Sequence, residues 1–182
     1  AFNLKRFDIA SRFLNAVNTT FSSRESLDLE GRAWNRQKNH KNALICWKKL
    51  IDKNTNIETN MDRAARAAFN SEYYLESAEI ALKLHKLRPE KNQHILLASR
   101  AIAREDNSPL KSTILSEVET AKNGSKESNL NKIKSLTELG SDDIAIQLVN
   151  EGLSIYPEDT DYNLIAGRSL MKIGDFDAAM YH

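Results

Sequence analysis

Basic side chains recur at a fixed spacing along the chain, and their chemistry is its clearest functional signal. One lysine or arginine appears every 34 residues, at Arg32, Arg66, Arg100, Lys134 and Arg168. Only 26 of the 182 residues are Lys or Arg, so chance seldom fills five successive positions of one column with them. A guanidinium group binds carboxylate or phosphate through two parallel hydrogen bonds. The spacing therefore predicts a series of anion-binding groups.

More polar residues accompany this basic column. Arg36, Arg104 and Lys172 each follow a member of the column by four residues, and Asn70 holds the same place after Arg66. Four residues is close to one helical turn, so these side chains would share a face with the column. The candidate binding residues are Arg32, Asn35, Arg36, Arg66, Asn70, Arg100, Arg104, Lys134, Arg168 and Lys172.

A second interpretation of the same arginines stays open. Asp28 lies four residues before Arg32, and Asp62 lies four residues before Arg66. That spacing is typical of ion pairs within one helix. The arginines would then be solvated or paired inside the protein, without a ligand.

Other chemistries find little support in the sequence. The histidines, His40, His85, His94 and His182, lack metal-ligand spacing and are expected on the surface. Cys46, the single cysteine, excludes an internal disulfide and a cysteine zinc site, and is expected to be a small core residue. A glycine-rich phosphate loop and a nucleophile elbow are both missing. We therefore expect no catalytic residue, no metal and no cofactor in this segment.

Composition narrows the classes of partner. The chain has 41% hydrophobic and 28% charged residues, with a net charge of +1. A nearly neutral chain has no strong overall attraction to nucleic acid or to membrane surfaces. No apolar run approaches the roughly 20 residues that span a bilayer. A single cysteine suits a reducing environment, so a cytoplasmic location is expected.

The elements that would carry the basic column are helices. Leu27, Gly31 and Trp34 recur at the spacing of one helical face. Ser22 and Glu25 have the spacing of a capping box, which predicts the start of this helix. A second helix follows in the same unit, indicated by Ala43, Trp47 and Leu50. No segment alternates with a period of two residues, so a sheet is not expected.

Small and apolar residues repeat with the same period of 34. The columns are Gly31, Ala65, Ser99 and Gly167; Trp34, Ala68, Ile102, Leu136 and Leu170; Ala43, Ala145 and Ala179; and Pro89 and Pro157. This pattern resembles the tetratricopeptide repeat (TPR) family, in which two-helix units stack to cover each other's apolar faces. The resemblance implies an all-α fold, a right-handed superhelical solenoid of antiparallel helix pairs.

The resemblance also implies boundaries. A single array would cover residues 1–182, with the second helix of a partial repeat at 1–23, full repeats at 24–57, 58–91, 92–125 and 126–159, and a truncated repeat at 160–182. Both ends of such an array would be open, so we expect it to be an excerpt of a longer TPR-containing protein.

Function follows from the resemblance as an expectation. In TPR proteins the first helices of successive units line a concave groove, and the basic column falls on that face. The chain would be a noncatalytic protein-protein interaction scaffold that presents an arginine-lined groove to an extended segment of a partner. The basic column favours a partner segment that is acidic. Members that bind chaperones use a Lys- and Asn-rich clamp, and Arg32, Asn35, Arg36, Arg66 and Asn70 are loosely similar in type. The alternative is an accessory domain, fused to or partnering the catalytic part of a larger bacterial enzyme, such as a cell-envelope or polysaccharide glycosyltransferase.

Overall fold

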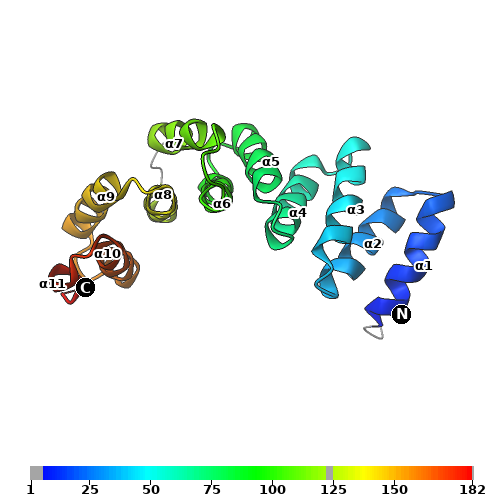
Figure 1. The fold of residues 1–182 in the computed structure, drawn as a ribbon, viewed down its shortest axis with the longest axis horizontal. Helices are drawn as coiled ribbons and strands as arrows, with labels where there is room; N and C mark the ends of the chain where they lie inside the picture. The colour runs from blue at the N-terminus through cyan, green and yellow to red at the C-terminus, as the bar shows by residue number, and fades with distance from the viewer. Residues whose placement is uncertain (1–5, 122–124, 182) are drawn as a thin grey trace. The chain divides into compact units, whose positions relative to one another are not determined.

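The structure, a computed structural model, describes residues 6–121 and 125–181, and every regular element within these ranges is a helix (Figure 1). In chain order the helices are α1 (Phe7–Thr20), α2 (Arg24–Arg36), α3 (His40–Asp52), α4 (Ile57–Asn70), α5 (Tyr74–Leu87), α6 (Asn92–Ile102), α7 (Leu110–Thr120), α8 (Lys126–Leu139), α9 (Asp142–Ile155), α10 (Thr160–Ile173) and α11 (Phe176–Ala179). The all-α prediction is confirmed.

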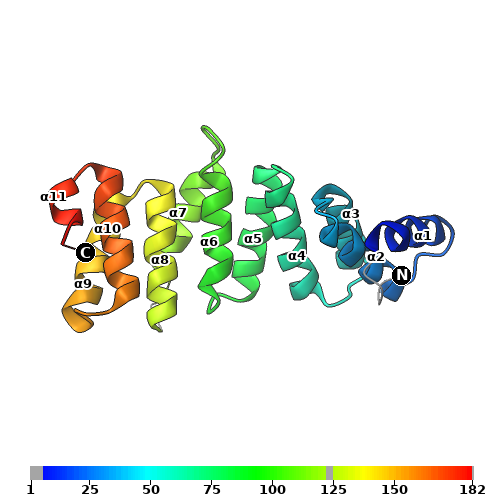
Figure 2. The same cartoon turned by 90° about the horizontal axis from the view of Figure 1, so that it is seen from below.

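The helices form two compact units, residues 1–84 and residues 85–182, and the boundary falls inside α5. In unit 1, α1 packs against α2, α2 against α3, and α3 against α4. In unit 2, α6 packs against both α7 and α8, and α8 packs against α9 (Figure 2). Neighbours in sequence are thus neighbours in space within each unit. The single array with 34-residue boundaries stays a prediction.

The start of α2 differs in detail from the expected capping box. The box consists of Ser23 and Ser26, one residue later than the predicted pair Ser22 and Glu25. Ser23 Oγ accepts from the Ser26 backbone N–H at 3.0 Å, and the Ser23 N–H donates to Ser26 Oγ at 3.1 Å. A serine hydroxyl can close the reciprocal bond that glutamate usually makes. Two adjacent serines therefore made the register ambiguous in the sequence.

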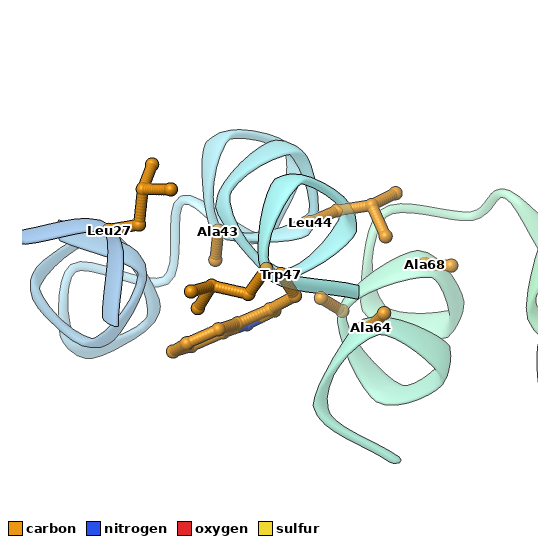
Figure 3. Packing of buried hydrophobic residues seen from close by; sticks show 8 residues of the cluster. Leu27, Ala43, Leu44, Trp47, Ala64 and Ala68 are labelled. Atoms are coloured by element: carbon orange, nitrogen blue, oxygen red, sulfur yellow. The ribbon is translucent and has the colours of Figure 1, made fainter. Parts of the chain in front are cut away.

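The core of unit 1 packs leucine and alanine side chains around one large ring, Trp47 (Figure 3). Trp47 on α3 is 2% exposed, and its indole lies against Gly31 of α2. A Cβ at Gly31 would come within 2.8 Å of that ring. On the other side, α4 contributes the buried Ala64 and Ala68 to the same cluster. Small residues on α2 and α4 thus make room for the indole between them.

A buried carboxylate fixes α1 and α2 together. Glu30 on α2 is 4% exposed and accepts from Asn18 Nδ2 at 2.7 Å. It also accepts from Trp34 Nε1 at 3.1 Å. Ser26 Oγ donates to Asn18 Oδ1, which closes the network. A buried polar group must find partners, and this network supplies them. No local pattern in the sequence predicts the burial of Glu30.

Two histidines contradict the expectation that all are on the surface. His85 and His94 are 4% and 5% exposed, respectively. Burial lowers the pKa of His85, because a charged imidazole loses its hydration there. Both residues lie at buried helical positions of unit 2. His40 is half-buried, and His182 lies outside the described residues.

Candidate functional site: an arginine pocket in unit 1

Five of the predicted binding residues line one cavity. Arg32, Asn35 and Arg36 of α2 meet Arg66 and Asn70 of α4 around a space of about 410 Å³. Two further residues complete the lining, Trp47 of α3 and Arg63 of α4. We call this cavity the arginine pocket. Its lining, as far as the structure describes it, holds four guanidinium groups and no carboxylate.

Helical spacing explains how these side chains converge. On α2, residues 32, 35 and 36 lie three and four positions apart, so they occupy one face. On α4, residues 63, 66 and 70 lie at intervals of three and four, again on one face. Helix α3 packs against both α2 and α4, so Trp47 can contact both sides. The His40 Nδ1 atom lies 3.0 Å from Asn35 Oδ1 and helps to hold that amide.

Arg63 forms the junction between the core and the pocket. Its guanidinium carbon lies 4.8 Å from the centre of the Trp47 ring, which is the geometry of a cation–π contact. Arg63 Nη1 also donates to Asp28 Oδ1 at 2.7 Å. The aromatic face and the carboxylate together hold this arginine in the lining of the pocket. Its position is therefore preorganised, unlike that of a free surface side chain.

The ion pairs of the second interpretation are also present. Arg32 Nη1 lies 3.6 Å from Asp28 Oδ2, and Arg66 Nε donates to both carboxylate oxygens of Asp62, at 3.1 and 2.9 Å. More than half of each arginine side chain remains exposed. Exposed pairs of this spacing contribute only about 0.3–0.5 kcal/mol. These ion pairs orient the arginines, but they are weak enough for an anionic ligand that binds more strongly to replace them.

The remaining candidate residues belong to unit 2 and do not line the arginine pocket. Arg100 pairs with Glu138 at 3.4 Å, and Lys172 lies 3.4 Å from Asp142 while also donating to the Thr137 carbonyl. Arg104 and Arg168 are exposed, and Lys134 is half-buried. Within the described ranges, Lys134 and Arg168 have no ion-pair partner. The five candidate residues of unit 1 thus line one common cavity, and the five of unit 2 are not part of it.

One residue of the pocket was missed in the sequence. Arg63 stands outside the 34-residue column, so the repeat pattern did not select it. Its signal was local: it precedes Arg66 by three residues, which places both on one face of a helix. Trp47 was assigned to the core, which is correct, but its ring also forms part of the pocket.

A neighbouring cavity of about 500 Å³ has a different chemistry. Arg63 lines it as well, but so do Glu25 and Asp28. Acidic and basic groups in the same lining give no preference for an anion. The two cavities share Arg63, and of these two the arginine pocket is the one whose described lining has a surplus of positive charge.

Across residues 6–121 and 125–181, histidine, cysteine and acidic side chains form no group of three or more that could hold a metal ion. Within those ranges, no helix combines the length and apolar character needed to cross a bilayer.

Cys46 has the environment of an inert core thiol. It is 4% exposed, and its pKa is raised to about 12, first by burial and then by the nearby Glu30 carboxylate. The folded state therefore favours the protonated thiol. This contribution to stability is complete below the thiol's ordinary pKa of 9.0 and is lost as the pH rises toward 12.

This environment predicts the reactivity of Cys46. We expect a thiol reagent to leave Cys46 unmodified in the folded protein at mildly alkaline pH, because the nucleophile is the thiolate. In urea the same residue should react like a free cysteine. The time course of reaction with a chromogenic disulfide measures both states. Rapid reaction without unfolding would contradict the assignment.

Comparisons with known proteins give a match in fold without a match in sequence. No protein-family model matches the chain, and no curated protein does. A solved structure described as "MamA RS-1 ArsTM double mutant" matches with a TM-score of 0.57 and 15% identity. The match covers 87% of this chain and 89% of that chain. It supports a TPR-like helical repeat fold, and at this identity the likeness concerns the fold alone.

Proposed function

We propose that this chain is a noncatalytic scaffold that binds an anionic segment of a partner protein in the arginine pocket. The observation that carries the proposal is the convergence of four guanidinium groups, from Arg32, Arg36, Arg63 and Arg66, on one cavity. A TPR-like fold supports a protein partner. The alternative of an accessory domain of a larger enzyme is compatible with such a site and stays a prediction.

Binding would use a surface that already exists. Trp47 and Asp28 hold Arg63, and Asp62 holds Arg66, so few arginine rotamers have to be fixed when a ligand arrives. Preorganisation of this kind lowers the entropic cost of association. Each guanidinium carries five N–H donors, so one pair with an aspartate does not exhaust its capacity. We also propose that Arg100, Lys134 and Arg168, the members of the basic column in unit 2, contribute to a groove that binds the same kind of partner.

The test compares charge reversal inside and outside the pocket. The pocket variant is Arg32→Glu/Arg36→Glu/Arg66→Glu. We expect it to weaken binding of a degenerate acidic peptide pool by about 100-fold, because several charge-assisted hydrogen bonds are lost. Fluorescence polarisation of labelled peptides measures the affinity, and circular dichroism checks the fold.

The control variant is Arg12→Glu/Lys83→Glu/Lys111→Glu. These three residues are exposed, lie on α1, α5 and α7, and are not among the residues that line the pocket. The control changes the net charge of the protein by the same amount. It should keep most of the affinity. Equal loss in both variants would show attraction to overall charge instead of a site, and unchanged binding by the pocket variant would refute the proposal.

A further inference from the structure

The balance of charge around the arginine pocket is unusual for a site that takes a single carboxylate. Four guanidinium groups line it, and in the part of the chain that the structure describes Asp28 and Asp62 form ion pairs with three of them. These aspartates do not appear in the lining that the structure describes. Four positive charges against two negative charges leave a surplus of two. A carboxylate would neutralise only half of that surplus.

The chemistry of the donors points in the same direction. All four basic side chains are arginines, whose planar fork matches the geometry of phosphate and carboxylate, whereas lysine acts as a point charge. Two oxygens of one carboxylate can satisfy about one such fork. A phosphomonoester offers three acceptor oxygens and a charge of about −1.5 to −2 near neutral pH. It can therefore engage several forks at once.

The lining also suggests what carries the anion. Asn35 and Asn70 flank the arginines from α2 and α4. An amide side chain both donates and accepts, as the peptide groups on either side of a bound residue would require. The indole of Trp47 is 2% exposed and covered by Arg63, so stacking of an aromatic ligand is not offered here. A small aliphatic carrier of the phosphate fits better than a phosphorylated aromatic ring.

We propose that the arginine pocket binds a phosphoserine or phosphothreonine side chain of an extended peptide segment. This inference rests on the proposed function, since it assigns the anion that the same site takes. The pairs with Asp28 and Asp62 set the charge surplus at two, which selects a dianion over a monoanion. Arg63, held by Trp47 and Asp28, would offer the phosphate group a donor whose position is already fixed.

The experiment uses three peptide pools that differ only at one fixed central residue. That residue is phosphoserine, serine or glutamate, and the flanking positions are degenerate. We expect the phosphoserine pool to bind about tenfold more tightly than the glutamate pool, the effect of roughly one additional charge-assisted hydrogen bond. The serine pool should bind more weakly than both. Inorganic phosphate alone should bind more weakly than the phosphoserine pool.

The pH dependence of the affinity distinguishes a phosphate ligand from a carboxylate ligand. Its second pKa is about 6, whereas arginine stays charged. Affinity for the phosphoserine pool should therefore fall several-fold between pH of about 7.5 and about 5.5, as the dianion becomes a monoanion. Affinity for the glutamate pool should stay nearly constant over that interval. Parallel profiles for the two pools would overturn the proposal.

A single conservative substitution tests the site without disturbing the fold. Arg36 is exposed and has no partner within the described ranges, so Arg36→Gln should leave the fold intact. It should lower affinity for the phosphoserine pool and narrow its advantage over the glutamate pool. Arg12→Gln is the matched control, since Arg12 is exposed on α1 outside the pocket.

The outcomes separate this inference from the proposed function. Equal binding of the phosphoserine and glutamate pools would overturn the phosphate assignment and leave an acidic-peptide scaffold standing. Binding of inorganic phosphate as tight as that of the phosphoserine pool would overturn the peptide assignment. Failure of every pool and of phosphate would remove both the inference and the proposed function.

Discussion

Replacing Trp47 with alanine is expected to destabilise unit 1 by about 3–5 kcal/mol, the usual cost of deleting a buried aromatic side chain. The indole is 2% exposed and fills the space that Gly31 leaves on α2. Ala64 and Ala68 on α4 belong to the same cluster and are too small to fill the cavity. Because both sides are lined by small residues on rigid helices, the site cannot collapse onto the missing ring.

The measurement is urea unfolding followed by circular dichroism, with hydrogen exchange to locate the loss. Amides of α2, α3 and α4 should lose protection, while those of α8 and α9 in unit 2 should keep it. Trp47→Phe is the matched control, since it keeps an aromatic ring and should cost clearly less. A loss below about 1 kcal/mol for Trp47→Ala would show that the indole does not anchor this core.

The same substitution also tests the connection between core and site. Arg63 rests on the indole at 4.8 Å, so alanine removes its support while Asp28 still pairs with it. Affinity for the acidic peptide pool should fall, at temperatures where the variant is folded. Trp47→Phe should retain more affinity, because a smaller aromatic face still attracts the guanidinium.

The sequence predicted the helices well because their signals are local. Apolar residues at helical spacing and a period of 34 fixed the order and type of the elements. Small residues such as Gly31 and Ala65 marked where helices approach closely, and Gly31 does lie against Trp47. The cap at Ser23 was misplaced by one residue, because Ser22 has a hydroxyl with the same chemistry. Local signals fix an element more firmly than they fix its first residue.

The site was predicted in part, and the missing part depends on packing between helices. The repeat column selected Arg32 and Arg66, and the structure places both in the lining of one cavity. It could not select Arg63, whose place is set by the Trp47 ring on another helix. Nor could it show that Asp28 pairs with an arginine 35 residues away as well as with its own helical neighbour. Such contacts require the packing of α4 on α3, which no local pattern encodes.

The burial of polar side chains was the second feature that could not be predicted from the sequence. Glu30 is buried because Asn18 and Trp34 supply hydrogen bonds from two directions. Composition statistics place glutamate on the surface, and they are right unless partners are present. The partner from α1 is twelve residues away, so its contribution appears only when the helices are packed.

Replacing Gly152 with alanine is expected to destabilise unit 2 by about 3 kcal/mol, at the upper end of the range for overpacking. A Cβ at this position of α9 would lie 2.2 Å from Cε1 of Tyr162 on α10. The ring has no room to retreat. Tyr162 is 1% exposed, its hydroxyl accepts from Asn129 Nδ2 at 3.0 Å, and Tyr156 stacks on it with ring centres 6.1 Å apart. The clash outweighs the gain in helix propensity, which is only about 1 kcal/mol.

A double-mutant cycle separates the clash from effects on the helix itself. In a Tyr162→Ala background the ring is gone, so Gly152→Ala should become neutral or stabilising by up to about 1 kcal/mol. Tyr162→Phe should give no such relief, because the ring atoms that clash remain. Urea unfolding of the four proteins of the cycle gives the coupling energy. If Gly152→Ala costs the same with and without the ring, the contact between α9 and α10 is not the cause, and the glycine is required for the backbone of α9 instead.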